Sequence, residues 1–215
     1  MIIQQLTVGP LQENCWLVAD ESAREAVLID PGDEAERLLR AVDGTGCVLS
    51  AIWLTHAHFD HLGAVAEIQR RSVVPVPVHL HPADQPLYER AHESGLLYGL
   101  NIETPQPASD KLAEGSRVSV GSIVFTVWHV PGHSPGHVAL ITDEHCFSGD
   151  LVFAGSIGRT DLPLCDPRAM QASLQRVAGL APDVRVFPGH GDATTIAREL
   201  SSNPFLRGVA RPIGT

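Results

Sequence analysis

The most constraining feature of this chain is a histidine-rich run between a predicted buried strand and a predicted helix. Val48–Leu54 is a continuous apolar run, which is typical of a strand buried on both faces. His56-Ala57-His58-Phe59-Asp60-His61 follows at once, and Leu62–Arg70 then carries apolar residues at helical spacing. Because the end of a buried strand is a rigid platform, we expect this loop to direct several side chains at one point.

The side chains of this run are metal ligands by type and by spacing. The imidazoles of His56 and His58 can reach the same ion, and Asp60 and His61 can face a second ion beside it. Nitrogen and oxygen donors suit zinc, iron or manganese better than a metal that prefers thiolates. Eleven histidines in 215 residues is also a high number, and imidazole is a common metal ligand. The run therefore predicts a metal site.

Three further loops have a candidate ligand directly after a predicted strand. They are Pro131-Gly132-His133, Ser148-Gly149-Asp150 and Pro188-Gly189-His190. The glycine beside each candidate ligand lets the backbone turn sharply and come close to an ion. We therefore predict that these loops meet the first one at a shared metal centre.

The rest of the chain forms two halves of similar pattern, each with strands, a helix and a further strand. In the first half we predict strands at Ile2–Val8, Cys15–Ala19 and Ala26–Ile29, and a helix capped by Asp33 that runs to Ala41. In the second half we predict strands and helices in this order: Arg117–Val120, Ile123–Val130, Val138–Thr142, His145–Ser148, helix Pro167–Leu180, Val184–Phe187 and helix Ala193–Ser201. Two such units predict an α/β (α+β) fold, a four-layer αββα sandwich formed by residues 1–215 as a single domain.

The middle of the chain is the least regular part. Val74–Leu80 contains two prolines, so we expect a short strand at a sheet edge. A helix is predicted at Ala83–His92, followed by an irregular stretch, Gly95–Asp110, rich in Gly, Pro and Thr. A long irregular loop in a compact domain is usually functional, and both a lid and a dimer contact fit this stretch.

Composition excludes several classes of partner. The formal net charge of −10 disfavours nucleic acid. No apolar run approaches the roughly 20 residues that span a bilayer, and the N-terminus has no signal-peptide pattern. The four cysteines form no C-x-x-C pair, so we expect reduced thiols and a cytoplasmic location. These features leave a small-molecule substrate as the expected partner, and the sequence does not indicate the oligomeric state.

The four motif loops together resemble those of the metallo-beta-lactamase superfamily, and in particular its short glyoxalase II-like (hydroxyacylglutathione hydrolase-like) branch. Supporting local matches are Glu13-Asn14-Cys15, Ile29-Asp30-Pro31-Gly32, Gly158-Arg159-Thr160-Asp161 and Asn203-Pro204-Phe205-Leu206. The resemblance covers nearly the whole chain. Full-length glyoxalase II has a C-terminal helical domain that contacts glutathione, and we expect that domain to be absent here.

The resemblance implies two divalent ions, with zinc expected and iron or manganese as alternatives. It implies that one ion is bound by three histidines: His56, His58 and His133. It implies that the other is bound by Asp60, His61 and His190, and that Asp150 bridges the two ions. Asp30 would brace the metal loop from behind. We predict that His137 supports its own loop and does not bind metal.

The implied chemistry is hydrolysis of a thioester such as S-lactoylglutathione by a metal-bridging hydroxide. Asp60 is the expected proton acceptor. The leaving thiol has an ordinary pKa of about 8.5, so it can depart without a strong general acid. That suits motif loops that contain no Glu, Lys or Tyr. Arg159 stands where a cationic contact to glutathione is usual, and it could equally be a structural partner of Asp161 or Asp166.

Two other activities use a similar set of residues. A mononuclear iron persulfide dioxygenase shares the histidine-rich run, but such enzymes commonly have cysteine at the position of His137 and leave the second ion site empty. The presence of His137 and the second ligand set favours the binuclear hydrolase. A lactone, β-lactam or other ester hydrolase of the same fold is not separated from a thioesterase by the sequence. A protein that only binds is disfavoured because all seven ligands are present.

Overall fold

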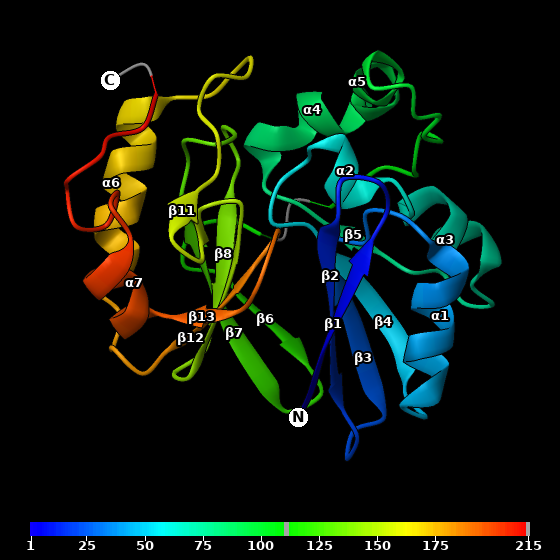
Figure 1. The fold of residues 1–215 in the computed structure, drawn as a ribbon. Helices are drawn as coiled ribbons and strands as arrows, with labels where there is room; N and C mark the ends of the chain where they lie inside the picture. Colours follow the sequence, from blue (N-terminus) through cyan, green and yellow to red (C-terminus); the bar gives the residue numbers. More distant parts are fainter. Residues whose placement is uncertain (110–111, 214–215) are drawn as a thin grey trace.

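The computed structural model describes residues 1–109 and 112–213. Residue 110, the last of the predicted irregular stretch, and residue 111 lie outside the described residues. The described chain folds into two sheets packed face to face, with helices on both outer faces (Figure 1). This confirms the predicted αββα layering.

The first sheet has the strand order β1-β2-β3-β4-β5 within the described residues. Its strands are Ile2–Val8, Glu13–Asp20, Glu25–Ile29, Val48–Trp53 and Val78–His79. Helices α1 (Ala35–Gly44) and α3 (Val65–Arg71) lie on its outer face (Figure 1). Strands β1, β2 and β3 pair antiparallel, whereas β3, β4 and β5 pair parallel.

The second sheet has the order β13-β12-β9-β8-β7-β6 within the described residues. Its strands, in chain order, are Arg117–Val120, Ile123–His129, Val138–Ile141, His145–Gly149, Arg185–Pro188 and Thr194–Thr195. Helices α6 (Pro167–Val177) and α7 (Ile196–Ser202) lie on its outer face (Figure 1). A two-stranded ribbon, β10 (Val152–Phe153) and β11 (Ser156–Ile157), follows β9.

Aromatic side chains fill the space between the two sheets. Trp53 of β4 meets Phe125 of β7 edge to face, with ring centroids 5.3 Å apart. Trp16 of β2 meets Phe187 of β12 in the same way at 4.8 Å. Such rings bury a large apolar area and prefer this geometry. They therefore fix the two sheets relative to each other, and with them the loops that each sheet presents.

The helix predicted at Leu62–Arg70 is interrupted, and this is a correction. Helix α2 spans Phe59–Leu62, and α3 begins only at Val65. The reason is a long-range contact, because the Ala64 N–H donates to the Pro31 carbonyl at 3.0 Å. The predicted cap of α1 was also wrong. The residue before α1 is Glu34, in the left-handed region at φ 56°, and the Asp33 carboxylate accepts from the Glu34 N–H, which is outside the helix.

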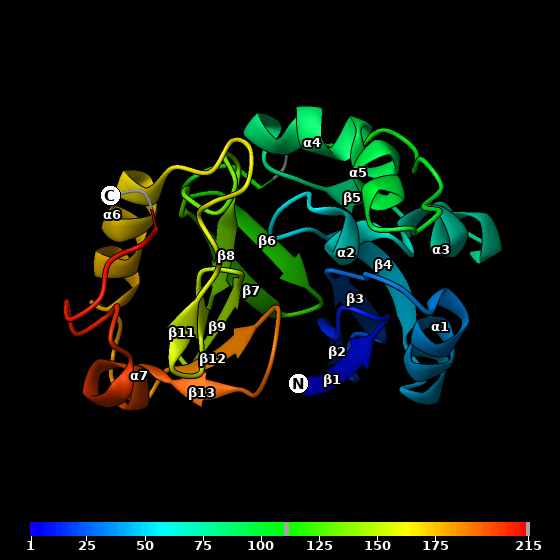
Figure 2. The ribbon, with the colours of Figure 1, turned by 45° about the horizontal axis from the view of Figure 1, so that its top comes forward.

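The middle segment is more helical than expected. A 3-10 turn (Pro82–Asp84) leads into α4 (Gln85–Glu89) and α5 (Ala91–Leu97), so the predicted helix is broken and its second part reaches into the stretch predicted as irregular. Helix α5 lies beside α2 (Figure 2). The predicted strand Val74–Leu80 shortens to β5, which lies at a sheet edge as expected.

The helix expected at Ala193 begins at Ile196, after the short strand β13, and α6 ends at Val177 and not at Leu180. The two-residue strands β10, β11 and β13 were not predicted, because so few residues carry no alternating pattern. Across residues 1–109 and 112–213, none of the helices combines the length and the apolar character needed to cross a membrane.

Candidate metal centre

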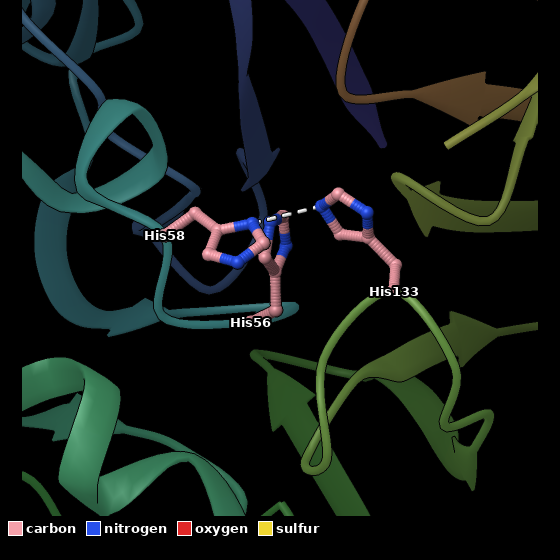
Figure 3. Close-up of side chains that lie close together, drawn as sticks. All are labelled: His56, His58 and His133. Atoms are coloured by element: carbon pink, nitrogen blue, oxygen red, sulfur yellow. Dashed lines mark hydrogen bonds between the residues drawn. The ribbon is translucent and has the colours of Figure 1, made fainter. Parts of the chain in front are cut away.

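The structure brings the seven predicted metal ligands together at one edge of the sandwich. Each of the four loops leaves a strand at that edge: β4, β7, β9 or β12. The ligand atoms of His56, His58 and His133 lie within 4.8 Å of one another (Figure 3). Those of Asp60, His61 and His190 form a second group within the same limit. Figure 3 shows the first three imidazoles turned toward one another from two different loops.

Asp150 lies between the two groups. Its Oδ2 is 3.4 Å from His133 Nε2 and 3.7 Å from His190 Nε2, and its Oδ1 is 3.4 Å from His61 Nε2. Two ligands of one tetrahedral ion, each at the usual bond length, are about 3.4 Å apart. The spacing of these atoms therefore suits coordination of ions on both sides of the carboxylate.

Several atoms of the cluster are buried without a hydrogen-bond partner in the described part of the chain. They are His56 Nε2, His61 Nε2 and Asp150 Oδ1. A buried polar atom without a partner costs free energy, so native structures rarely leave several together. All three point into the cluster, where a cation would satisfy them. The donor set thus fits a metal on its own chemistry.

Hydrogen bonds on the far side of each ring fix which nitrogen faces the cluster. The Thr55 hydroxyl donates to Asp30 Oδ2 at 2.6 Å, so its oxygen accepts from His56 Nδ1 at 3.1 Å. His133 Nδ1 donates to the Arg159 carbonyl at 2.8 Å. With the proton on Nδ1, the Nε2 lone pair of each ring faces the cluster, where His133 Nε2 lies 2.8 Å from His58 Nδ1 (Figure 3).

Asp30 lies behind the histidine loop, where the resemblance implied it. Its carboxylate accepts from the Thr55 N–H at 2.7 Å and from His61 Nδ1 at 3.1 Å. Asp30 is itself in the left-handed region, at φ 54°. Its contacts hold both the loop backbone and the ring of one predicted ligand.

His137 is fully buried beside the cluster but contacts the backbone of a neighbouring loop. Its Nε2 accepts from the Asp150 N–H at 3.2 Å. Gly149, at φ 48°, makes this approach possible, because a Cβ there would lie 2.3 Å from Thr55 Oγ1 and 2.7 Å from His137 Nε2. His137 is absent from the three groups of potential ligands found among the described residues, the third being Asp30, His56 and His61.

The electrostatics favour neutral imidazoles and ionised carboxylates. Burial, together with the neighbouring His61 and His58, lowers the pKa of His56 well below its ordinary value. Burial and His133 lower the pKa of His58 to about 3. Although burial opposes its charge, the pKa of Asp150 is lowered by His61 and His133. Neutral histidine and anionic aspartate are the forms that bind a divalent cation.

His61 and His190 differ from His56 and His58, because neighbouring carboxylates raise their pKa above the ordinary value although burial opposes this. At His61, burial disfavours the charged form, but the carboxylates of Asp150 and Asp60 raise the pKa well above the ordinary value. These carboxylates create a negative potential at His61 Nε2, and a divalent cation would take the place of the proton there.

The sequence did not mark Asp84, which is fully buried next to the cluster. Its Oδ2 accepts from the Ala57 N–H at 3.0 Å and from the Ser134 hydroxyl at 2.7 Å, and its Oδ1 accepts from the Gly136 N–H at 2.5 Å. Asp84 therefore joins the loop that carries His56 and His58 to the loop that carries His133. The local sequence gave no signal beyond an acid near the start of a predicted helix.

Glu13 is the second residue without a predicted role. Both of its carboxylate oxygens are buried without a hydrogen-bond partner among the described residues, and Oε1 is 3.7 Å from His61 Nδ1. Burial raises the pKa of Glu13 well above its ordinary value. The adjacent Asn14 donates to the carbonyls of Pro188 and Gly191, so β2 holds the His190 loop. The only signal was their place in the motif Glu13-Asn14-Cys15.

A cavity of about 520 Å³ opens over the cluster, and His58, Asp60, His133, Asp150 and His190 all contribute to its lining. Arg159 also lines this cavity. Of the contacts left open for Arg159, the structure shows the pair with Asp161, in which Nε and Nη2 donate to the two carboxylate oxygens at 2.7 and 2.9 Å.

Several known proteins are similar to this chain in sequence and in fold. The family model described as the metallo-beta-lactamase superfamily matches residues 8–190. The chain is 36% identical over 210 residues to "Hydroxyacylglutathione hydrolase GloC" of Haemophilus influenzae, covering 96% of this chain and 98% of the relative. A crystal structure of TTHA1623 in a di-iron-bound form is 50% identical with a TM-score of 0.86, covering 94% of this chain and 100% of the other. The B3 metallo-beta-lactamase BLEG-1 is 38% identical with a TM-score of 0.87, covering 95% and 99%.

An αββα sandwich with clustered histidines and aspartates at one edge defines a class of metal-binding enzymes that act on small molecules. This chain belongs to the metallo-beta-lactamase superfamily. Its relatives include hydroxyacylglutathione hydrolases, which agrees with the predicted glyoxalase II-like branch.

Proposed function

We propose that this protein is a binuclear metal-dependent hydrolase that cleaves a thioester of the S-lactoylglutathione type. The observation that carries the proposal is the position of Asp150, whose carboxylate lies within 3.7 Å of histidines from both groups of ligands. A carboxylate shared in this way suits a pair of ions held side by side. The full-length similarity to a protein named hydroxyacylglutathione hydrolase supports a thioester as the substrate.

In this proposal, His56, His58 and His133 hold one ion, and Asp60, His61 and His190 hold the other. Zinc is the expected metal, with iron and manganese as alternatives. The similar protein TTHA1623 was crystallised in a di-iron-bound form, which supports testing iron first among these. When bound, a pair of divalent ions lowers the pKa of a shared water toward neutrality and thereby supplies a hydroxide nucleophile.

The chain's own residues orient the reaction and move the proton. Asp60 lines the cavity, and the neighbouring His61 and His190 lower its pKa although burial opposes this. Its carboxylate is therefore ionised and can accept the proton of the attacking water. Asp30 and His137 act as positioning residues, because they hold His61 and the Asp150 backbone in place.

The character of the cavity also favours a thioester over an amide. Among the described residues, its lining includes no Lys and no Glu that could protonate a poor leaving group, and its phenol, Tyr98, is exposed and packs against Phe59. A thiolate can leave without such a proton donor, because its conjugate acid has a pKa of about 8.5. An amine or alkoxide leaving group would need one.

The proposal is tested by measuring thiol release from S-lactoylglutathione with purified, metal-loaded enzyme. We expect turnover with two ions per chain, and a loss of at least about a hundredfold in His58→Ala. His92→Ala is the matched control, because His92 lies in α5 outside both ligand groups and outside the cavity lining. Mass spectrometry of the metal content accompanies each assay.

Two results would select the alternatives. One iron per chain, with oxygen uptake on glutathione persulfide and no thiol release, would identify a persulfide dioxygenase. Hydrolysis of a lactone or β-lactam at a higher kcat/KM than any thioester, at matched metal content, would identify another hydrolase of the same fold. The 38% identity to BLEG-1, which is named as a metallo-beta-lactamase, makes β-lactams a necessary part of the substrate panel.

A further inference from the structure

We propose that the site selects thioesters that carry an aliphatic chain next to the scissile bond, in preference to the short, polar lactoyl group on glutathione. This inference rests on the proposed thioesterase function. It concerns the cavity walls that are formed by residues other than the predicted metal ligands. The cavity of about 520 Å³ is in the usual size range for a small-molecule site.

The walls of the cavity away from the metal ligands are mainly apolar. Six aliphatic and aromatic side chains contribute to them: Leu11, Leu87, Leu97, Phe153, Ile157 and Leu162. Ser94, Tyr98, Ser156 and Arg159 add polar groups to the same lining. The apolar part of the wall releases water when it contacts an aliphatic chain.

One apolar wall continues from the ligand loop to the surface. Phe59, between His58 and Asp60 in the sequence, packs against Tyr98 with ring centroids 4.9 Å apart. Leu97, the next residue along the wall, is 86% exposed at the end of α5. Leu96 beside it is 60% exposed. Single exposed apolar side chains are ordinary, but Leu97 also lines the cavity, so its side chain extends the apolar wall.

The charges at the cavity offer little to a thiol that carries two free carboxylates. Arg159 is the cationic side chain among the lining residues, and Asp161 already accepts two of its hydrogen bonds. The floor adds the carboxylates of Asp60 and Asp150. The guanidinium has further N–H donors, so a glutathione carboxylate would share Arg159 with Asp161. An aliphatic chain needs no such partner.

The experiment compares thioesters with the metal-loaded full chain by thiol release. One arm varies the acyl side, with acetyl-, butanoyl-, hexanoyl- and lactoyl-glutathione. The other varies the thiol side, with the thioacetates of glutathione and of hexanethiol. Each buried methylene is expected to raise kcat/KM by about two- to fourfold. We therefore expect at least a tenfold preference for the six-carbon chain over acetyl or lactoyl on one of the two sides, and that side identifies where the chain binds.

A variant pair ties the preference to the wall. Leu97→Gln replaces an exposed apolar side chain by a polar one of similar length. Because the position is exposed, the variant should fold. We expect it to reduce the hexanoyl-to-acetyl ratio of kcat/KM about three- to tenfold. Leu200→Gln, at a partly exposed leucine of α7 that does not line the cavity, is the matched control and should leave that ratio unchanged.

Three results would overturn the inference. A kcat/KM for thioesters that is flat or falls with chain length on both sides would overturn it while leaving the thioesterase function intact. An unchanged ratio in Leu97→Gln, with a change in mass by light scattering, would mean that the rim is an interface between copies of the chain. Absence of hydrolysis of every thioester at full metal content would overturn the proposed function itself, and the inference with it.

Discussion

The hydroxyl of Ser134 donates a hydrogen bond of 2.7 Å to the carboxylate of Asp84, which also accepts from the backbone of Ala57. The carboxylate is fully buried, and its partners lie in loops from the two different sheets. The two loops carry His56, His58 and His133 between them. The relative position of the first group of ligands therefore depends on an acid that is outside the group.

We expect Asp84→Asn to impair the enzyme without removing a ligand. An amide offers one acceptor oxygen where the carboxylate offers two, so one of the three donors would face an NH2 group. Loss of a partner that orients metal ligands typically costs about 10- to 100-fold in metal affinity or activity. An unpaired buried donor should also lower the free energy of unfolding by about 1–3 kcal/mol. Steady-state kinetics and urea unfolding measure the two effects.

The control for this substitution is Asp143→Asn, an exposed aspartate between β8 and β9. It should change kcat/KM by less than about twofold, since surface substitutions away from special features have small effects. Wild-type kinetics in Asp84→Asn, together with wild-type stability, would show that the two loops keep their positions without this carboxylate.

Asp30→Asn tests the residue behind the second ligand group. Asn tolerates the left-handed backbone that Asp30 adopts at φ 54°, so the change isolates the side chain. The negative acceptor for His61 Nδ1 is lost, and the ring should bind its ion about 10- to 100-fold more weakly. After gel filtration, the metal content should fall from two ions per chain toward one.

Asp33→Asn is the comparison for Asp30→Asn, because Asp33 is an exposed aspartate of the same loop. This variant should retain both ions. If Asp30→Asn also retains both ions, at wild-type affinity in a competition with a chelating dye, then Asp30 does not support the second site.

The meeting of four loops that carry His and Asp could be predicted because each loop has its own local signal. In each loop an apolar strand ends and a residue of a type that binds metal follows, in three of them with a glycine beside it. Gly149 and Asp150 are an example. The layering could be predicted for a related reason, since the periodicity of strands such as Ile2–Val8 is local. These signals can be read from the sequence of one segment without knowing what packs against it.

The features that were missed depend on contacts between distant segments. Asp84 meets Ala57 across 27 positions and Gly136 across 52, so nothing near Asp84 in the sequence marks it. The break between α2 and α3 has the same origin, because the Ala64 N–H is diverted to the Pro31 carbonyl. Burial of Glu13 also follows from the packing of β2 against the ligand loops.

Removal of metal should lower the thermal stability of the protein. The ligands come from loops of both sheets, and His56 Nε2 and His61 Nε2 have no hydrogen-bond partner among the described residues. An ion present at a hundred times its dissociation constant stabilises the folded state by about 2.7 kcal/mol. For a chain of this size that corresponds to roughly 5–10 °C in Tm for each ion.

Scanning calorimetry before and after dialysis against a chelator measures this shift, and added metal should reverse it. In His58→Ala the shift should be smaller, because one site is already weakened. An identical Tm with and without the chelator, at confirmed loss of metal, would contradict the ligand assignment.

Asp20 joins the two sheets at a distance from the metal centre, and its contribution to stability should depend on pH. Its carboxylate accepts from the Ser22 hydroxyl, and its Oδ2 accepts from the Ser122 hydroxyl at 2.7 Å and N–H at 2.8 Å. These bonds, the one from Ser22 first, hold the pKa of Asp20 well below its ordinary value. A lowered pKa means that the folded state favours the ionised form, so the stabilisation is complete above the unfolded pKa of about 3.9 and is lost as the pH falls through the folded pKa.

We therefore expect Asp20→Asn to lower the urea midpoint at pH 7 and at pH 5, and to differ less from the wild type at pH 3. Comparing the variant with the wild type at each pH cancels the titration of the metal ligands, which both proteins share. Asp43→Asn, at an exposed aspartate near the end of α1, should show no difference at any of the three values. If the Asp20→Asn difference is equally large at pH 7 and pH 3, the charge of Asp20 is not what stabilises this contact, and its neutral hydrogen bonds are sufficient.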